Sequence, residues 1–216
     1  MAKFLGFGPN MEIQFSGKLG NVVGVARKDG TYYVRSMPEK HKDAKSPKQQ
    51  QQRKRFGAMN KLISRLNPII IRPIWHGTSR KLPGATLFSK ANYQLFDKEG
   101  KITDYSKLKM TVGSFAVPFG MRFHNDEESE GVIRIEWSQY IKPNTYAPVK
   151  LNALAMCGDD IVLLDNQDID EENCMAQVSL PFAKGSEVHL YVFFSGNIVP
   201  RKPTYSNSHY FHIETL

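Results

Sequence analysis

Val188-His-Leu-Tyr-Val-Phe-Phe194 is apolar at positions that a β-strand would present on both of its faces. Successive side chains of a strand point to opposite faces, so a run of this kind is typical of a strand in the middle of a sheet. We therefore predict a central strand over residues 188–194.

The surrounding sequence alternates between apolar and polar residues with a period of two, which indicates further strands. Together with the central run, strands are expected at residues 107–112, 133–137, 149–155, 161–164, 176–180, 188–194 and 211–213. About seven short strands separated by turns over about 110 residues are typical of an antiparallel β-sandwich. Residues 105–216 are therefore predicted to form one.

A family resemblance is carried by Trp137, on the second of these segments, and by Leu180-Pro-Phe-Ala-Lys-Gly-Ser-Glu-Val188 before the central run. They resemble the fibronectin type III pattern, in which a Leu, a Pro/Gly turn and an alternating strand follow one another. Val188 stands where that family usually has a tyrosine, so the hydrogen bond of a tyrosine corner is absent. The resemblance implies a seven-stranded fibronectin III/Ig-like sandwich.

The first half begins with a predicted β-hairpin over residues 21–35. Asp29-Gly30 lies between two β-rich arms, and this dipeptide is a favoured two-residue hairpin loop because both positions need a positive φ. A two-residue loop at this place sets Val25 opposite Val34 and Ala26 opposite Tyr33.

Helices are predicted after the hairpin. Ser46 is placed as N-cap, Pro47 as the first helical residue and Gln49 as the partner that closes a capping box. Apolar residues then recur at helical spacing until Asn67-Pro68, at Phe56, Met59, Leu62, Ile63 and Leu66. Residues 69–75 fit helix or strand, and 85–96 fit another helix. Residues 1–104 are thus predicted to be a hairpin-plus-helices module, and the fold class mainly β.

Charge is divided unevenly between these halves. The chain carries a net charge of +8, but residues 1–104 have 20 Lys and Arg against 7 Asp and Glu, and residues 105–216 have 9 against 14. On the first predicted helix, basic residues lie on or beside one face, at Lys54, Arg55, Lys61 and Arg65. Such a stripe can bind a polyanion through its phosphates. The alternative is a solvated face that meets the acidic sandwich or an acidic partner.

No residue pattern points to catalysis, a metal or a cofactor. His209 and His212 are three apart on a predicted strand and so face opposite sides. Residues 165–172 lack the glycine and spacing of a calcium loop. Ser195 and Cys157 lack the surroundings of a nucleophile motif, and Cys157 and Cys174 are expected to be free thiols. We expect a non-enzyme without cofactor.

The whole chain resembles an uncharacterised bacterial family, a domain of unknown function found in Bacteroidota-type genomes. The residues that carry the resemblance are Gly20–Gly24, Tyr33–Ser36, Ser46, Gln49, Gln52, Arg53, Phe56, Asp104–Lys107 and Ser206–Tyr210. This resemblance implies no activity.

The sequence also gives expectations for the cellular location and the function of the protein. The sequence has no apolar run of eighteen residues and no signal-peptide pattern at its N-terminus, so we expect a cytoplasmic protein without a membrane partner. The expected function is that of a structural or adaptor protein that binds another protein or assembles into an oligomer. The alternative is a nucleic-acid-binding protein that uses the basic Lys40–Arg65 region.

Overall fold

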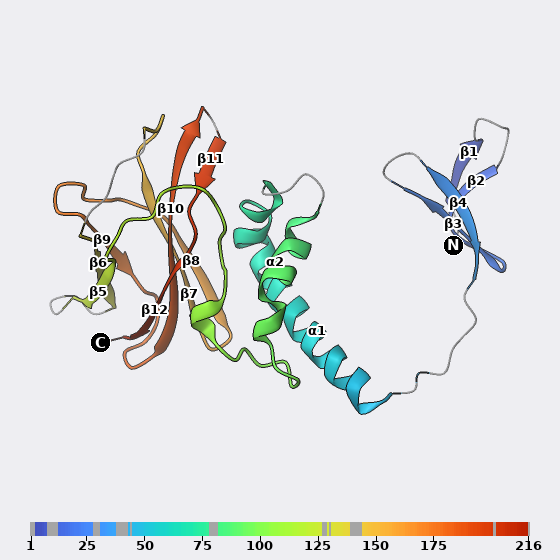
Figure 1. The fold of residues 1–216 in the computed structure, drawn as a ribbon, viewed down its shortest axis with the longest axis horizontal. Helices are drawn as coiled ribbons and strands as arrows, with labels where there is room; N and C mark the ends of the chain where they lie inside the picture. The colour runs from blue at the N-terminus through green and yellow to red at the C-terminus, as the bar shows by residue number, and fades with distance from the viewer. Residues whose placement is uncertain are drawn as a thin grey trace. The chain divides into compact units, whose positions relative to one another are not determined.

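The computed structural model shows a mainly β protein with antiparallel sheets and two α-helices (Figure 1). It describes residues 3–7, 13–27, 31–37, 43, 45–77, 82–126, 129, 131–138, 144–200 and 202–215. The chain separates into two compact units, Met1–Lys45 and Ser46–Leu216. Each unit is described by itself below.

The first unit is a four-stranded antiparallel sheet in which every strand pairs with its neighbour in sequence. Its strands are β1 (Lys3–Phe7), β2 (Ile13–Leu19), β3 (Val22–Ala26) and β4 (Tyr32–Ser36). The predicted hairpin corresponds to β3 and β4 and is confirmed. The sequence analysis did not predict β1 and β2.

The predicted register of that hairpin is wrong by one residue. Val25 pairs with Tyr33 and Ala26 with Tyr32, and the N–H of Arg27 donates a hydrogen bond of 2.9 Å to the carbonyl of Thr31. Three residues therefore separate the paired ends instead of two, and a one-residue shift moves every β4 side chain to the other face. The predicted turn at Asp29-Gly30 itself lies outside the described residues.

The second unit contains two antiparallel sheets. One has the strand order β5-β6-β9, from β5 (Arg122–Asn125), β6 (Val132–Glu136) and β9 (Met175–Ser179). The other has the order β11-β10-β7-β8, with β12 also paired to β10. Its strands are β7 (Lys150–Cys157), β8 (Asp160–Gln167), β10 (Glu187–Val199), β11 (Lys202–Tyr205) and β12 (His209–Glu214). The predicted central run forms part of β10.

The break between β11 and β12 lies at Ser206, and both strands run along β10. Ser206 is fully buried, its N–H donates to the carbonyl of Phe194, and its hydroxyl accepts from the N–H of Phe194 at 2.8 Å. A side chain thus replaces one ladder hydrogen bond, so the buried backbone of β10 stays paired across the break.

The helices begin where the sequence predicts. In α1 (Pro47–Leu66), the Ser46 side chain accepts from the N–H of Gln49, and the Gln49 side chain accepts from the N–H of Ser46. The capping box is therefore confirmed. A π-helical segment, Asn67–Ile71, continues α1 through the ambiguous run, and α2 (Gly84–Asn92) follows. No helix in the described part of the chain has the length and apolar character needed to cross a bilayer.

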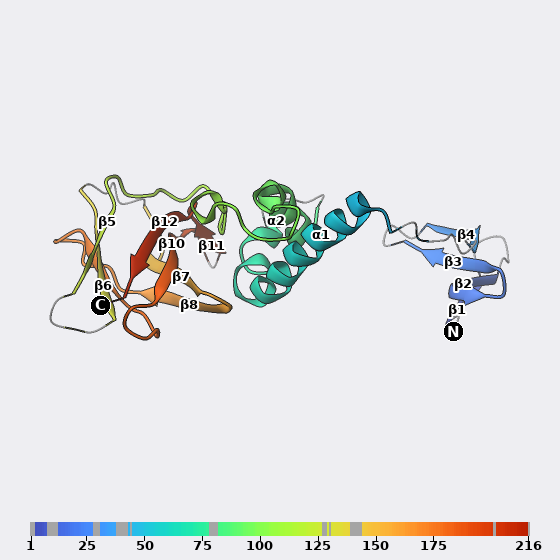
Figure 2. The ribbon, with the colours of Figure 1, turned by 90° about the horizontal axis from the view of Figure 1, so that it is seen from below.

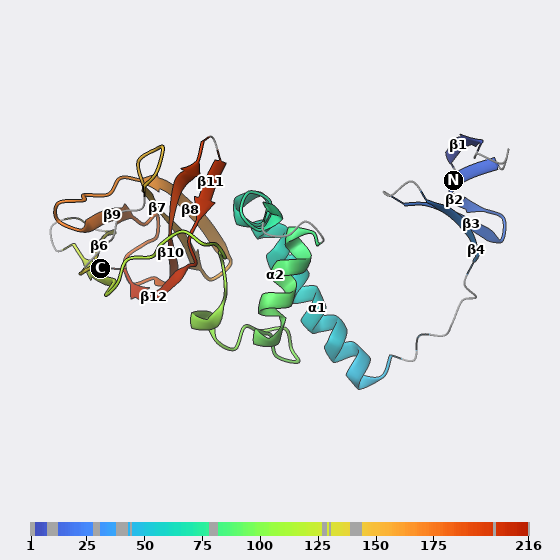
Figure 3. The same ribbon diagram turned by 45° about the horizontal axis from the view of Figure 1, so that its top comes forward.

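Residues 46–215 thus form three layers, with the five-stranded sheet in the middle (Figures 1, 2 and 3). Leu190 and Val192 of β10 face the β5-β6-β9 sheet and share a buried cluster with Ile135 and Trp137. Tyr191 and Phe193 point the other way, into a second buried cluster with the helices. That second cluster includes Met59, Leu66, Ile70, Trp75 and Phe88.

The predicted strand at residues 107–112 is wrong. Its alternation is real, because Leu108 and Met110 are buried, but the segment pairs with no strand. Side chains satisfy its backbone instead. Asn92 accepts from the N–H of Lys109 at 2.8 Å and donates to the Lys109 carbonyl at 3.1 Å, and the Trp75 indole donates to the Met110 carbonyl at 2.8 Å. The segment is a crossover strap, and β5 and β11 are strands of this unit that the sequence analysis missed.

The helices share a buried cluster with β7 and β10. The stability of fragments therefore tests the domain boundary that the sequence predicts at residues 104/105. A fragment of residues 105–216 leaves Leu154, Tyr191 and Phe193 without a covering layer, and each such side chain contributes about 1.5–3 kcal/mol by burial. Since whole domains are stable by about 5–15 kcal/mol, we expect this fragment to be unfolded or aggregated. A fragment of residues 46–216 should unfold cooperatively.

Urea unfolding followed by near-ultraviolet circular dichroism compares the two fragments directly. Equal unfolding free energies would show that the boundary at 104/105 separates independent domains and that the helical layer is dispensable.

Candidate functional site

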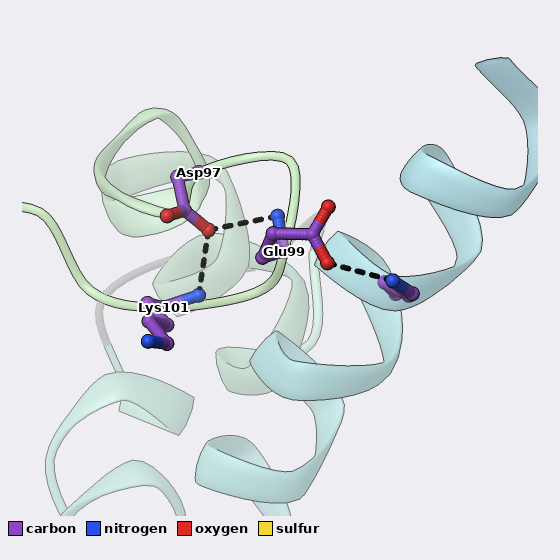
Figure 4. Close-up of polar contacts among 4 residues, drawn as sticks. Asp97, Glu99 and Lys101 are labelled. Atoms are coloured by element: carbon purple, nitrogen blue, oxygen red, sulfur yellow. Dashed lines mark hydrogen bonds and ion pairs between the residues drawn. The ribbon is translucent and has the colours of Figure 1, made fainter. Parts of the chain in front are cut away.

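The basic residues predicted to form a polyanion site lie on α1, and each described member has a partner within its own unit. The Lys54 ammonium is 2.6 Å from a carboxylate oxygen of Glu99. Figure 4 shows why Glu99 points at α1: Asp97 accepts the N–H groups of Glu99 and Lys101, at 2.9 and 2.8 Å, and so closes the turn. Lys40 and Lys42, at the start of the predicted basic region, lie outside the described residues.

Gly100 lets this turn approach α1. It has a φ of +85°, and a Cβ on it would lie 2.9 Å from the Cβ of Ala58 and 3.1 Å from the carbonyl oxygen of Lys54. Only glycine combines that backbone conformation with so close a contact. The turn thereby brings an acidic residue to the basic face of the helix.

Arg55 is held more firmly than the other three basic residues. Its guanidinium donates to the Tyr93 carbonyl at 2.9 Å and lies 4.3 Å from the centre of the Tyr93 ring. These contacts combine a charge-assisted hydrogen bond with a cation–π interaction. Arg55 therefore links α1 to the end of α2, and it is a poor candidate for capturing a polyanion.

Lys61 and Arg65 share one acidic partner, Asp159, in the turn between β7 and β8. The distances to its carboxylate are 3.6 Å from Lys61 and 3.5 Å from Arg65, and the Asp159 side chain is 89% exposed. Exposed pairs of this kind contribute about 0–1 kcal/mol each. Both cations can therefore exchange Asp159 for an external anion at low cost.

Lys61 and Arg65 also line a groove of about 450 Å³ between α1, the segment 96–105 and the β7–β8 turn. Its apolar lining includes Leu62, Phe96, Ile102 and Met156, and Lys101 adds a third cation. Three positive side chains thus surround this groove against the single carboxylate of Asp159. The groove is suited to an anionic ligand with an apolar part.

A cluster of tyrosine and histidine side chains lies beside this groove, and sequence analysis missed it. The rings of Tyr105 and His189 are stacked, with centroids 3.8 Å apart and an interplanar angle of 6°. Nδ1 of His189 is 2.8 Å from the Tyr210 hydroxyl, and the Tyr191 hydroxyl donates to the Tyr105 carbonyl at 2.8 Å. Together these contacts dock the turn at Tyr105 onto β10 and β12.

The electrostatics of this cluster favour neutral rings. Burial lowers the pKa of His189, the nearby His212 lowers it further, and Glu187 opposes both. Burial likewise raises the pKa of Tyr191 and of Tyr210. Asp104, at the start of the turn, has a pKa of about 2 because Lys107 and Ser106 hydrogen-bond to its carboxylate. The cluster is thus a packed anchor of neutral rings, and the charges of Asp104, Lys107 and Glu187 lie beside it.

The other residues weighed for chemistry do not gather into a site. His209 and His212 face opposite sides of β12, as predicted, because their neighbours on β10 are Val192 and His189. Ser195 accepts a hydrogen bond of 2.9 Å from Asn152 beside a cavity of about 440 Å³. Cys157 and Cys174 are free and half-buried. Among the described residues, no three His, Cys, Asp or Glu side chains lie where they would hold a metal ion.

The four-stranded sheet of the first unit is amphipathic. Cross-strand partners share a face, so the register of Leu19 with Val22 and of Gly24 with Val34 defines one face without charge. We call it the apolar face; its described members are Gly17, Leu19, Val22, Gly24, Ala26, Tyr32, Val34 and Ser36. Gly17 has a φ of +105°, and Phe15 beyond it lies over this face against Gly24. The opposite face carries Lys18 and Arg35 and, beyond the strand end, Arg27 over the Tyr33 ring at 4.9 Å.

Part of the apolar face is covered within its own unit, because Phe15 lies directly against Gly24 and its N–H donates a hydrogen bond of 3.3 Å to the Tyr32 hydroxyl. Other apolar side chains of the sheet stay exposed. Phe4 is 60% exposed, Leu19 56% and Val34 47%, and Gly24 is the only described residue of this unit that is buried. Isolated exposed apolar residues are ordinary, but several on one small sheet mark a candidate interaction surface.

The lowered pKa of His189 predicts acid sensitivity. The unfolded chain binds a proton at a higher pH than the folded chain, so stability is full above the unfolded pKa of about 6.5 and falls as the pH drops below it. His189→Phe preserves the stack on Tyr105 and removes the titration. We expect its unfolding free energy to change less between pH 7.5 and pH 5.5 than that of the wild type, by urea titration.

His76→Gln, which removes an exposed histidine outside the cluster, serves as the control for the loss of an imidazole. Parallel curves for wild type and His189→Phe would rule out His189 as a source of acid destabilisation.

Comparisons with family models, curated proteins and solved structures give no match to this chain in any of the three. The resemblances to fibronectin type III domains and to the uncharacterised bacterial family therefore stay predictions. Any proposal about function has to rest on the geometry described above.

Proposed function

We propose that this chain is a non-enzymatic structural or adaptor protein that acts through protein–protein binding or assembly. The observation that carries the proposal is the group of exposed apolar side chains on the β1–β4 sheet, Phe4, Leu19 and Val34. A sheet of this size needs a packed layer to be stable in water, because two-sided exposure leaves its apolar side chains in contact with solvent. A protein surface that covers Phe4, Leu19 and Val34 supplies that layer.

The second unit supports the adaptor role by its rigidity. Its five-stranded sheet is buried on both faces, and the described contacts of Arg55, Asn92 and Tyr105 fasten the helices and the strap to it. We infer that this unit holds its shape on binding and presents fixed surfaces. In this adaptor the exposed sheet binds a protein partner, and the second unit presents fixed surfaces.

The finer fold of residues 105–216 belongs to the same proposal: a seven-stranded fibronectin III/Ig-like sandwich. The order β5-β6-β9 corresponds to strands A, B and E of such a domain, and β8-β7-β10 corresponds to C′, C and F. The broken strand β11/β12 then takes the place of G. The edge-to-face contact of Trp137 with Phe194, at 5.6 Å between centroids, supports this assignment.

Binding through the apolar face is tested with two adjacent substitutions in β4. Val34→Lys puts a charge on the apolar face, whereas Tyr33→Lys puts the same charge on the basic face, at a similarly exposed position. Proteins cross-linked to the chain in the producing cell are compared by quantitative mass spectrometry. We expect Val34→Lys to lose at least one specific partner by about tenfold or more, since an unpaired charge is costly to bury.

Tyr33→Lys should retain the partners of the wild type. If the Val34→Lys chain keeps every partner at wild-type level, the apolar face is not the binding surface and the proposal fails.

Nucleic-acid binding through the Lys40–Arg65 region is the second candidate, and the cations around the α1 groove favour it. Lys61→Gln with Arg65→Gln removes two of them. If they contact phosphates of duplex DNA, the slope of log K against log salt should become less steep by about 2. Fluorescence anisotropy with labelled DNA and RNA across a salt series measures it.

Lys184→Gln with Lys202→Gln, at two exposed positions that do not line the groove, provides the matched loss of two charges. Absence of binding by the wild-type chain at low salt, or equal slopes for all variants, would eliminate this second function.

A further inference from the structure

The helical side of the five-stranded sheet changes from apolar to polar at one end. On β10, Phe193 is buried in the cluster with the helices, and Ser195, two residues on, lies on the same side. Cross-strand partners share a face, so Lys150 of β7 and Tyr205 of β11, which both pair with Ser195, belong to this polar end. Asn152 lies one pair further in, opposite Phe193. Three neighbouring strands thus present polar side chains at the same level of the sheet.

These residues line a cavity of about 440 Å³, which we call the sheet-end cavity. The sheet adds Asp165 and Asn197 to its lining, and the π-helical segment and the residues after it add Ile69 and Pro73. Small-molecule sites have volumes of about 300–1,000 Å³ and combine apolar walls with a few converging polar groups. A sheet end that met only solvent would have no apolar wall facing it. The sheet-end cavity therefore has the build of a ligand site.

The polar wall of the sheet-end cavity offers both donors and acceptors. Asn152 is buried, with 4% of its surface exposed, and its amide donates a hydrogen bond of 2.9 Å to the Ser195 hydroxyl. The Ser195 proton therefore points elsewhere, and the described part of the chain provides no acceptor for it. Burial raises the pKa of Tyr205 and the Asp165 carboxylate raises it further, so the Tyr205 hydroxyl stays protonated and can also donate.

The charges around the sheet-end cavity favour a ligand without net charge. Its described lining has one cation, Lys150, and one anion, Asp165. The Lys150 ammonium also forms an ion pair with Asp168, which does not line the cavity. An anionic ligand would have to compete with Asp168 for Lys150, and a cationic ligand would be repelled by Lys150. This cavity differs in that respect from the groove beside α1.

A sugar ring matches both walls of this cavity. Its hydroxyl groups donate and accept hydrogen bonds around the rim, and its C–H groups give the ring apolar faces. We propose that the sheet-end cavity binds a neutral sugar ring, with hydroxyl groups on Ser195, Asn197 and Asp165 and a C–H face on Ile69 and Pro73. This site lies in the second unit, so it does not depend on the protein-binding surface proposed for the first unit.

The test uses the isotope-labelled full-length chain and the methyl glycosides of glucose, galactose, mannose, fucose and N-acetylglucosamine. Each glycoside is added from about 1 to 50 mM, a range that fills a site with a millimolar dissociation constant. In nitrogen–proton correlation spectra, at least one glycoside should cause saturable shifts of the amides of residues 150–152, 163–165 and 195–197. The amides of β4 should not shift. Glycerol, which has hydroxyl groups but no ring, should cause no saturable shift.

Substitutions on the polar wall give the first check on the location of the site. Ser195→Ala and Asp165→Asn should each raise the dissociation constant of the bound glycoside by about 3- to 10-fold, the effect of losing one hydrogen bond. Asp160→Asn is the matched control, because Asp160 is an exposed carboxylate of the same strand, β8, and does not line the cavity. It should leave the dissociation constant unchanged.

Filling the cavity gives the second check. Ala147 lines the cavity, so the indole of Ala147→Trp would take the space of the sugar and should abolish the saturable shifts. Tyr146→Trp places the same indole on the neighbouring residue, which is 72% exposed and does not line the cavity. This control should bind the glycoside like the wild type, and the spectra show at the same time whether each variant is folded.

Three results would overturn the proposal: no saturable shift with any of the five glycosides, the same shifts with glycerol, or binding that persists in folded Ala147→Trp. The Val34→Lys chain should bind the glycoside as the wild type does. Sugar binding and protein binding are therefore tested separately, and the failure of one leaves the other standing.

Discussion

The burial of β10 on both faces is the constraint on which residues 46–215 depend. Leu190 and Val192 need one apolar layer, and Tyr191 and Phe193 need another, because adjacent side chains of a strand point to opposite sides. The β5-β6-β9 sheet supplies the first layer and the helices the second. The apolar residues of α1 and α2 therefore belong to the same folding problem as the strand, although more than 90 positions separate them from it.

This coupling explains which elements are predictable from sequence. The start of α1 is fixed locally, by the reciprocal hydrogen bonds of Ser46 and Gln49. The core strands follow from local alternation or from a continuous apolar run. The strap at residues 107–112 shows the same alternation and yet is no strand, because Asn92 and Trp75 provide the hydrogen bonds that a neighbouring strand would give. The periodicity of apolar residues indicates which side chains are buried. It does not indicate whether the backbone is hydrogen-bonded to a neighbouring strand or to side chains.

The candidate site was less predictable because its electrostatics depend on contacts distant in sequence. The basic stripe on α1 is visible as a helical spacing, but Glu99 lies 45 positions from Lys54 and Asp159 lies 94 from Arg65. Because the carboxylates of Glu99 and Asp159 lie next to these cations, the stripe is a set of ion pairs beside a groove and not an open cationic face. The stacking of Tyr105 on His189 was equally hidden, since neither residue has a distinctive neighbour in sequence.

An apolar sheet face has to be covered by another layer, and the two units differ in whether they contain that layer. In the second unit both faces of the five-stranded sheet find an apolar layer within the unit. In the first unit Phe15 covers Gly24, but Phe4, Leu19 and Val34 stay about half exposed, and the same rule then favours a cover from elsewhere. A polyanion cannot provide it, because phosphates would contact the basic face and leave the apolar one in water. The exposed apolar side chains thus favour the proposed protein partner over nucleic acid for this unit, even though the chain as a whole is basic.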